Sequence, residues 1–326
     1  MKVFVTGGAG YIGSHVVRQL AAAGHTVRVF DNLSEGHAAA VPEGTLVVGD
    51  LLDPAALESA LAEGFDCAMH FAANCLVAES MADPQKYYRN NVVGSLNLAA
   101  AMRKTGVRRI VFSSTAATYG TPETCPIDED HPQRPINPYG QTKLDFERAL
   151  AYDAEAYGLG YAALRYFCAA GTAPDASIGE DHEPETHLIP VVLQVALGRR
   201  DAIHIFGTDY PTRDGTCIRD FIHVEDLAQA HILALEAIEP GKGLAYNLGN
   251  GNGYTVREVV EVARRVTGHA IPAVEDARRP GDPHELVASS ERIARDLGWK
   301  PRYPDLETII ETAWRWHQAR PDGYGD

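Results

Sequence analysis

The sequence predicts an α/β fold in which a doubly wound parallel sheet is followed by a smaller C-terminal domain. The first observation is a Gly-rich turn, Gly7 to Gly13, that joins an apolar strand-like run to a helical pattern. The second is that further apolar, strand-like runs alternate with helical patterns, as in a parallel sheet covered on both faces. The third is a change after about residue 168 to irregular stretches rich in Gly, Pro, Asp and Glu. Together they predict a Rossmann-type sheet with an appended domain.

The strands of the sheet are expected at residues 2–6, 26–31, 45–50, 66–72, 109–113 and 161–167. The helix after the Gly-rich turn buries Ile12, Val16, Val17 and Leu20 on one side, and Gly24 is expected to end it in a left-handed conformation. In the second part of the chain, helices are expected near 188–198, 255–267 and 305–318.

These patterns predict two domains, residues 1–167 and 168–326. The apolar segment 223–238 and the short run 245–248 can both return to the first domain. We therefore expect segment 219–250 to belong to it, which makes the boundary discontinuous.

Composition restricts the possible partners. The 326-residue chain is 45% hydrophobic and 22% charged, which is typical of a globular protein, and its formal net charge of -15 repels nucleic acid and anionic lipid. Five widely spaced cysteines without a CxxC pair fit a reducing compartment. Neither an export signal nor a membrane-spanning run is recognised. A cytoplasmic protein with no nucleic-acid or membrane partner is predicted, and any phosphate it binds belongs to a small molecule.

The Gly-rich turn predicts a dinucleotide site. Its glycines fit both GxGxxG and GxxGxxG, in the strand-turn-helix setting that lets a backbone approach a pyrophosphate at the positive end of a helix. About eighteen residues on, Asp31 ends the second strand, where a carboxylate accepts hydrogen bonds from ribose and repels a 2′-phosphate. NAD is therefore predicted in preference to NADP. The alternative is a Gly-rich turn without a ligand.

Tyr139 and Lys143 predict a base beside that site. Asn137 is the expected N-cap of their helix and Pro138 its first residue, so Tyr139 and Lys143 share one face near the positive helix end. The Lys143 ammonium, the helix end and the charge of an oxidised nicotinamide are expected to lower the pKa of Tyr139, which makes it a usable base. The alternative is an ordinary surface pair.

Hydroxyl groups follow the expected fifth strand. Ser113, Ser114 and Thr115 stand at its C-terminal end, the edge where open α/β sheets bind ligands. Any of them can contact a reacting oxygen, although such clusters are usually turns or helix caps.

At this point the chain resembles the extended short-chain dehydrogenase/reductase family over nearly its whole length. The segments that carry the resemblance are Thr6 to His15, Asp31 to Leu33, Gly49 to Leu51, His70 to Ala73, Tyr87 to Gly94, Ser113 to Gly120, Pro138 to Lys143, Leu164 to Phe167, Ile205 to Thr216 and Ile218 to Val224. The resemblance is to the members that invert C4 of a UDP-linked hexose, interconverting the UDP-glucose and UDP-galactose configurations through a 4-keto intermediate. It implies NAD as cofactor, a UDP-sugar as substrate, the second domain as its binding domain, and a homodimer formed through the helix around 84 to 105 and the Tyr139 helix.

The resemblance also implies roles for particular residues. The catalytic residues are Tyr139, Lys143 and Thr115. The cofactor contacts are Gly7, Gly10, Tyr11, Ile12, Gly13, Asp31, Asn32, Asp50, Leu51, Phe71, Ala72, Ala73, Asn91, Tyr139, Lys143 and Tyr166. The substrate contacts are Thr115, Tyr139, Phe167, Leu188, Phe206, Arg219, Arg279 and Asp282. For Arg219 and Arg279, a plain ion pair is the alternative.

The chain departs from the family pattern at three positions. Cys168 replaces a usual Asn and Cys75 replaces a Lys or Ser of many relatives, so a polar contact can be lost at each. Leu286 stands where some relatives have a bulky Tyr, which leaves room for N-acetylhexosamine substrates, and a pentose stays open.

Rival functions share the same oxidation. A dehydratase, a decarboxylase or a dehydrogenase also begins with it, but dehydratases usually carry an Asp-Glu pair after the Thr, where this chain has Ala116 and Ala117. A silent NAD-sensing protein is the alternative outside enzymes. No metal is predicted: the segment 182–187 has two His, but their spacing is not HExxH and Pro184 interrupts any helix, so a loop is expected.

Overall fold

The computed structural model describes residues 1–279 and 282–325 and contains the predicted parallel sheet. Seven strands lie in the order β10-β6-β5-β4-β1-β2-β3, and every neighbouring pair is parallel. Their bounds are β1 Lys2–Thr6, β2 Thr26–Asp31, β3 Leu46–Val48, β4 Cys67–His70, β5 Arg109–Thr115, β6 Gly160–Tyr166 and β10 Gly243–Leu248. The predicted fold class is confirmed, and the six expected strands are present with small shifts of their ends.

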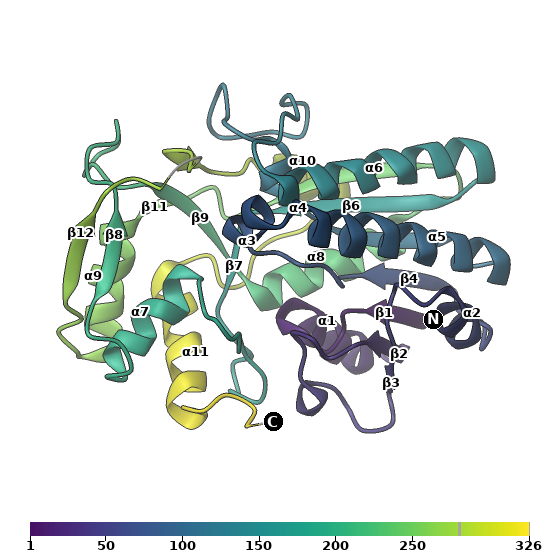
Figure 1. Ribbon diagram of the computed structural model, residues 1–326, viewed down its shortest axis with the longest axis horizontal. Coiled ribbons are helices and arrows are strands. Elements are labelled where there is room, and N and C mark those ends of the chain that lie inside the picture. The colour runs from purple at the N-terminus through teal and green to yellow at the C-terminus, as the bar shows by residue number, and fades with distance from the viewer. Residues whose placement is uncertain (280–281, 326) are drawn as a thin grey trace.

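Helices cover both faces of this sheet, because its strands are apolar on both sides (Figure 1). On one face, α1 (Tyr11–Ala22) and α8 (Val224–Ala237) pack together over a core that includes Val16, Leu20 and Leu227. On the other face, α2, α5 and α6 bury Leu57, Leu98 and Phe146. The bounds of these three helices are Pro54–Leu61, Gly94–Thr105 and Pro138–Tyr157.

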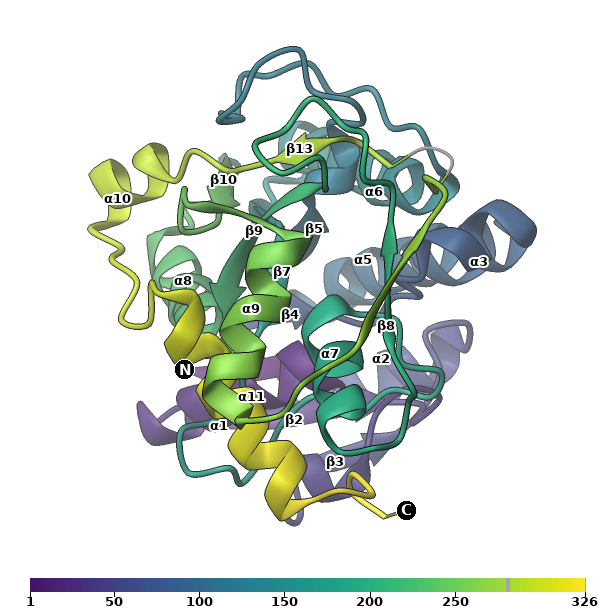
Figure 2. The ribbon, with the colours of Figure 1, turned by 90° about the vertical axis from the view of Figure 1, so that its left-hand side faces the viewer.

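Helices α7, α9 and α11 lie at the opposite side of the molecule and share a third apolar core (Figure 2). The remaining strands form a small sheet around β9, which pairs with β7, β11 and β13, and a separate pair, β8 with β12. The bounds are β7 Cys168–Ala170, α7 Leu188–Ala196, β8 Ile203–Phe206, β9 Ile218–His223, β11 Gly253–Thr255, α9 Val256–Thr267, β12 Ala273–Asp276, β13 Glu285–Leu286 and α11 Leu306–Ala319.

The segment 219–250 is divided between the two groups of elements. β10 lies at the edge of the large sheet and α8 packs on α1, whereas β9 is the centre of the small sheet. The chain therefore crosses from one sheet to the other between β9 and α8. Short connecting elements complete the fold: α3 Val77–Ala82, α4 Pro84–Tyr87, a π-helical turn Tyr88–Val93, α10 Glu291–Leu297 and two 3₁₀ turns, Ala38–Ala40 and Ala116–Thr118.

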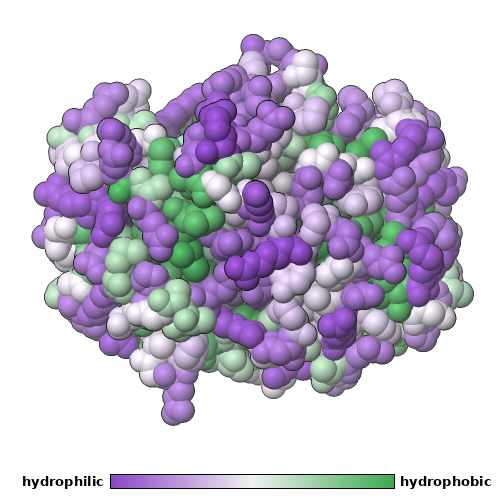
Figure 3. Space-filling view, turned by 180° about the vertical axis from the view of Figure 1, so that it is seen from behind, coloured by the Kyte–Doolittle hydropathy of each residue, from purple (hydrophilic) through white to green (hydrophobic). Residues whose placement is uncertain are grey.

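The surface seen from behind is mostly hydrophilic, with apolar residues gathered in patches (Figure 3). Among the described residues, we find no helix with the length and apolar character needed to span a bilayer.

Candidate functional site

The Gly-rich turn makes a close backbone approach that only glycine allows. Gly7 has a φ of 71°, and a Cβ there would lie 2.3 Å from the backbone nitrogen of Ala72. A Cβ on Gly13 would lie 2.1 Å from the Gly7 carbonyl oxygen, whereas on Gly10 it would meet only that oxygen, at 3.5 Å. Because α1 begins without a side-chain cap, the turn can offer its first N–H groups, including those of Tyr11 and Ile12, to an anion.

A cleft opens beside this turn, past the C-terminal ends of β1, β2 and β4. Its lining includes nine of the predicted cofactor residues: Gly7, Gly10, Asp31, Asn32, Asp50, Leu51, Phe71, Ala72 and Ala73. The Asp31 carboxylate is held in place by the N–H groups of Ala9 and Leu33, each at 2.9 Å, and burial raises its pKa. Polar residues that the sequence did not single out, Ser34 and Asn90, also line it. A narrow cleft with a ribose acceptor and an exposed helix end fits a dinucleotide.

Tyr139 and Lys143 stand at the start of α6, as predicted. Asn137 Oδ1 accepts the Gly140 N–H at 2.8 Å, and Pro138 is the first helical residue. The Lys143 Nζ does not meet the phenol: it donates to the Ser113 carbonyl oxygen at 2.8 Å and lies 6.0 Å from the centroid of the Tyr139 ring. Burial lowers the pKa of Lys143 to about 8.

In the ligand-free protein the pKa of Tyr139 is raised, whereas the expected lowering included the charge of an oxidised nicotinamide and stays a prediction for the NAD-bound protein. Burial of its hydroxyl raises that pKa well above the ordinary value, and a hydrogen bond with Thr115 opposes the rise only in part. Desolvation is the largest cause, and the neighbouring Cys75 and Tyr166 side chains raise this pKa further.

Two predicted cofactor residues, Tyr166 and Asn91, form hydrogen bonds with residues next to Thr115 and Lys143. Tyr166 and Ser113 share a hydrogen bond between their hydroxyls. Asn91 accepts the Asn74 N–H at 2.9 Å and donates to the Asn74 carbonyl oxygen at 2.9 Å and to Thr142 at 3.2 Å. Its amide therefore ties the loop after β4 to α6, instead of pointing freely into the cleft.

The predicted substrate residues outside the large sheet and α6 lie on β8, β9 and α7 and in the loops next to β7 and β13. Arg219 of β9 forms an ion pair with Asp282, so the plain ion-pair alternative holds for Arg219 in the ligand-free chain, with another predicted substrate residue as its partner. The Arg279 guanidinium lies 3.9 Å from the centroid of the Phe206 ring. Leu286 lies in register with Arg219 on the neighbouring strand.

The chain leads directly from β6 of the large sheet to the small sheet. Phe167 follows β6, its N–H donating to the Leu248 carbonyl oxygen at 3.3 Å, and Cys168 then begins β7 beside β9. Leu188 is the first residue of α7, at the end of the connection that follows β7.

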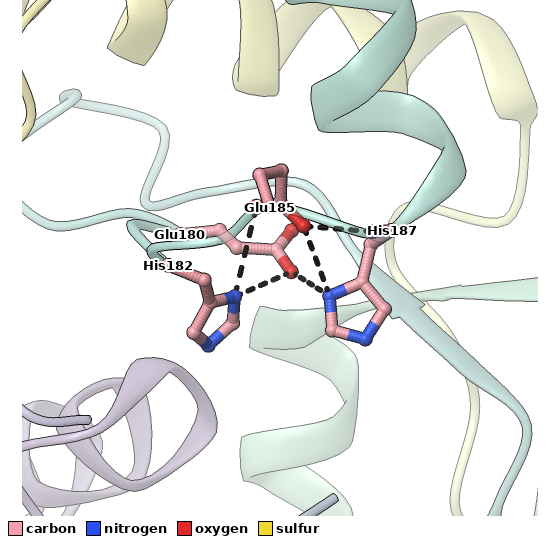
Figure 4. A group of neighbouring side chains, drawn as sticks. All are labelled: Glu180, His182, Glu185 and His187. Carbon is pink, nitrogen blue, oxygen red and sulfur yellow. Dashed lines mark hydrogen bonds and ion pairs between the residues drawn. The ribbon is translucent and has the colours of Figure 1, made fainter. Parts of the chain in front are cut away.

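That connection holds a group that the sequence analysis set aside. The segment is a loop, as expected, yet Glu180, His182, Glu185 and His187 converge at its end (Figure 4). Burial opposes a charged imidazole, but the two carboxylates raise the pKa of His182 to about 11 and also raise that of His187. The helical HExxH template could not find this group, because its four members alternate along an irregular segment.

The fold and these residues define a nucleotide-binding α/β protein with a tyrosine and lysine pair of the dehydrogenase type. A family model described as "NAD dependent epimerase/dehydratase family" matches residues 3–249. The chain belongs to this family, so the recognised family relationship and the NAD cofactor are confirmed.

Individual relatives agree over the full length. The chain is 54% identical to a UDP-glucose 4-epimerase of Halalkalibacterium halodurans, over 99% of this chain and 98% of that protein. It is similar to the UDP-glucose 4-epimerase of Brucella ovis in complex with NAD, with a TM-score of 0.93, 50% identity and coverage of 96% and 97%. It is also similar to the Bifidobacterium longum enzyme in complex with NAD+ and UDP, with a TM-score of 0.94, 35% identity and coverage of 99% and 100%.

Proposed function

We propose that the protein is an isomerase that interconverts UDP-glucose and UDP-galactose by reversible oxidation at C4. The observation that carries the proposal is the group of Tyr139, Thr115 and Lys143, in which Thr115 hydrogen-bonds the phenol and the Ser113 carbonyl oxygen holds the Lys143 ammonium. NAD, when bound, supplies reversible hydride transfer. Relatives of half or more identical residues carry the same activity in their names.

In this proposal, Tyr139 moves the proton of the C4 hydroxyl group. Thr115 hydrogen-bonds the phenol and can reach the same substrate oxygen, which orients the proton transfer. Lys143 is fixed by Ser113, at the place where a ribose hydroxyl group is expected. Because burial raises the Tyr139 pKa in the free protein, the acidity that a base requires must come from charges that enter the cleft with the ligands.

The UDP part is assigned to the small sheet and α7. Arg219 and Arg279 offer planar groups that can hold two phosphate oxygens each, while Phe206, Phe167 and Leu188 supply apolar contact. Asp282, which pairs with Arg219, would exchange that partner or share it when the nucleotide binds. The loosely contacted hexose could then turn over while its nucleotide stays anchored, which presents the opposite face of C4.

Two rivals are less well supported. A dehydratase needs an acid and a base after Thr115, where the 3₁₀ turn Ala116–Thr118 carries Ala116 and Ala117. A dehydrogenase would consume NAD in proportion to its product, which an assay can count. Leu286, in register with Arg219, leaves N-acetylhexosamine substrates possible by size.

We also propose a cytoplasmic homodimer. Helices α5 and α6 carry exposed apolar side chains, among them Leu96 and Tyr152, which a second copy would cover. Five free thiols fit a reducing compartment. Light scattering of the purified protein gives its mass, and a monomer at micromolar concentration would contradict the dimer.

The test is to incubate the purified protein with UDP-galactose, UDP-glucose and their N-acetyl forms, with and without NAD, and to identify the products by NMR. Tyr139→Phe is expected to keep NAD and UDP binding but to lose about 100- to 10,000-fold in turnover, because only the proton transfer is removed. Tyr157→Phe, which changes an exposed tyrosine at the last residue of the same helix, is the matched control and should turn over normally. Near-normal turnover by Tyr139→Phe, or no conversion by the native chain with NAD present, would overturn the proposal.

A further inference from the structure

Four side chains at the end of the loop between β7 and α7 form a compact His-Glu cluster: Glu180, His182, Glu185 and His187. The ligand atoms of the four, one from each, all lie within 4.8 Å of one another, and no other such group occurs in the part of the chain that the structure describes. We propose that this cluster is a structural zinc site, with His182 Nδ1, His187 Nδ1 and one oxygen of each carboxylate as ligands.

Several distances between the donor atoms are close to the edge of a zinc tetrahedron. Zinc bonds of about 2.0 to 2.1 Å to nitrogen and oxygen place neighbouring ligands about 3.3 Å apart. His182 Nδ1 lies 3.4 Å from Glu180 Oε1 and 3.6 Å from Glu185 Oε2. His187 Nδ1 lies 3.5 Å from the other Glu185 oxygen, Oε1, so the Glu185 carboxylate must turn for one of its oxygens to serve as the ligand. One edge is shorter, the 2.6 Å hydrogen bond of His187 with Glu180, and it would open by about 0.7 Å around the ion.

One ligand atom has no other partner to satisfy it. His182 Nδ1 is buried and makes no hydrogen bond, although it faces both carboxylates at ion-pair distance. In Figure 4 each imidazole turns a nitrogen toward the carboxylate oxygens, and the opposite nitrogen points away. A buried nitrogen aimed between two carboxylates is the arrangement that a metal ion completes.

The donor set of the cluster can also balance the charge of a divalent ion. The two glutamate side chains are 4% and 3% exposed, and within the described residues no Lys or Arg side chain pairs with them. Two carboxylates and two neutral imidazoles would balance one divalent ion, which displaces the protons that the imidazoles otherwise hold between the carboxylates. Imidazole ligands favour zinc over magnesium or calcium, and four protein ligands leave no open position for a reacting water, as in structural zinc sites.

The backbone around the cluster is already in place. Glu185 accepts the N–H groups of Thr186 and His187, both at 2.7 Å, and the Glu180 carbonyl oxygen accepts the Trp316 indole N–H at 3.2 Å. The His182 ring meets the Tyr11 ring edge-on, with centroids 6.3 Å apart. A bound ion would therefore fix the loop between the start of α1 and the start of α7.

The experiment uses the full chain, treated with a chelator and then dialysed. Zinc chloride is titrated by calorimetry, and retained zinc is counted by mass spectrometry. We expect one zinc per chain at micromolar affinity or tighter, a higher melting temperature with zinc, and a visible spectrum typical of tetrahedral coordination when cobalt replaces zinc. Because these readouts need no turnover, they remain informative if the proposed isomerase activity fails.

Variants locate the ion. His182→Ala and Glu180→Gln should each weaken zinc binding by more than about 100-fold, since direct ligands matter more than their supporting partners. His204→Ala, which removes an exposed histidine paired with Asp276, is the control and should bind zinc normally. The proposal is overturned if the native chain binds no zinc, because the cluster is then an ion-pair network only. It is also overturned if the variants bind zinc as the native chain does, because the ion then lies elsewhere, such as on the thiols.

Discussion

Replacing Glu147 should reveal how firmly α6 is anchored to the large sheet. Glu147 on α6 and Arg165 on β6 form an ion pair whose two side chains are each only 7% exposed. Arg165 Nε lies 3.0 Å from one carboxylate oxygen and Nη2 2.6 Å from the other, and the Ser114 hydroxyl group donates to the same carboxylate. Burial disfavours the guanidinium charge, but the hydrogen bonds with Glu147 raise the pKa of Arg165 above its usual value.

Glu147→Gln would leave that guanidinium buried and charged without its counter-ion. Losing one partner of a buried pair costs about 3 to 5 kcal/mol. The glutamine keeps the shape and one acceptor oxygen, and Arg165 still donates to the Tyr119 hydroxyl group at 2.9 Å. We therefore expect a loss near the lower end, about 3 kcal/mol of the free energy of unfolding.

The assay is chemical unfolding of the cofactor-free protein, followed by tryptophan fluorescence and by circular dichroism. Glu123→Gln is the matched control, since its pair with Arg134 is 58% and 74% exposed and should contribute about 0.5 kcal/mol or less. A loss below about 1 kcal/mol for Glu147→Gln would refute the reasoning, because it would mean that the buried charge is solvated or neutralised without Glu147.

Three further perturbations test other parts of the site. Lys143→Met should remove a pH dependence of the free energy of unfolding. Because the pKa of Lys143 is lowered from 10.5 to about 8, its charge costs the folded protein about 3 kcal/mol below pH 8. The native chain should therefore gain stability relative to the variant between pH 8 and 10.5, and parallel stability curves would contradict this. Gly13→Ala should lower the melting temperature of the cofactor-free protein and abolish NAD binding, whereas Gly10→Ala should melt normally; equal melting temperatures would remove the steric argument. Leu286→Tyr should narrow the sugar pocket and slow UDP-N-acetylglucosamine more than UDP-glucose, and equal effects measured by NMR would count against that placement.

The large sheet and the dinucleotide turn could be predicted because their signals are local. Continuous apolar runs define β1 and β5. Glycine is required at position 13 because a Cβ would meet the Gly7 carbonyl oxygen, and at position 7 because a Cβ would meet the Ala72 nitrogen. Asn137 indicated the start of α6, because an Asn side chain is a favourable N-cap and its oxygen accepts the Gly140 N–H. In these places local preference and the final packing agree.

The Tyr139 pKa, the pairing of β9 and the His-Glu cluster depend on three-dimensional distances, which a pattern along the sequence does not give. The pKa of Tyr139 in the ligand-free protein follows mainly from the burial of its hydroxyl group, which the spacing of four between Tyr139 and Lys143 does not reveal. The segment 219–250 was expected to belong to the first domain, but its first strand, β9, forms hydrogen bonds with β7, β11 and β13 of the small sheet. His182 and His187 were judged against a helix, and an irregular loop brought their nitrogens together instead.

The position of Glu147 on α6 restricts where residues can be inserted or deleted in this chain during evolution. Tyr139, Lys143 and Glu147 follow one another at every fourth residue, so the phenol, the ammonium group and the carboxylate that pairs with Arg165 lie on one face of α6. One residue inserted between the second and the third would rotate Glu147 by about 100° away from Arg165. The connection that precedes Pro138 carries no such alignment, so evolutionary insertions and deletions should accumulate there and be absent from the first three turns of the helix.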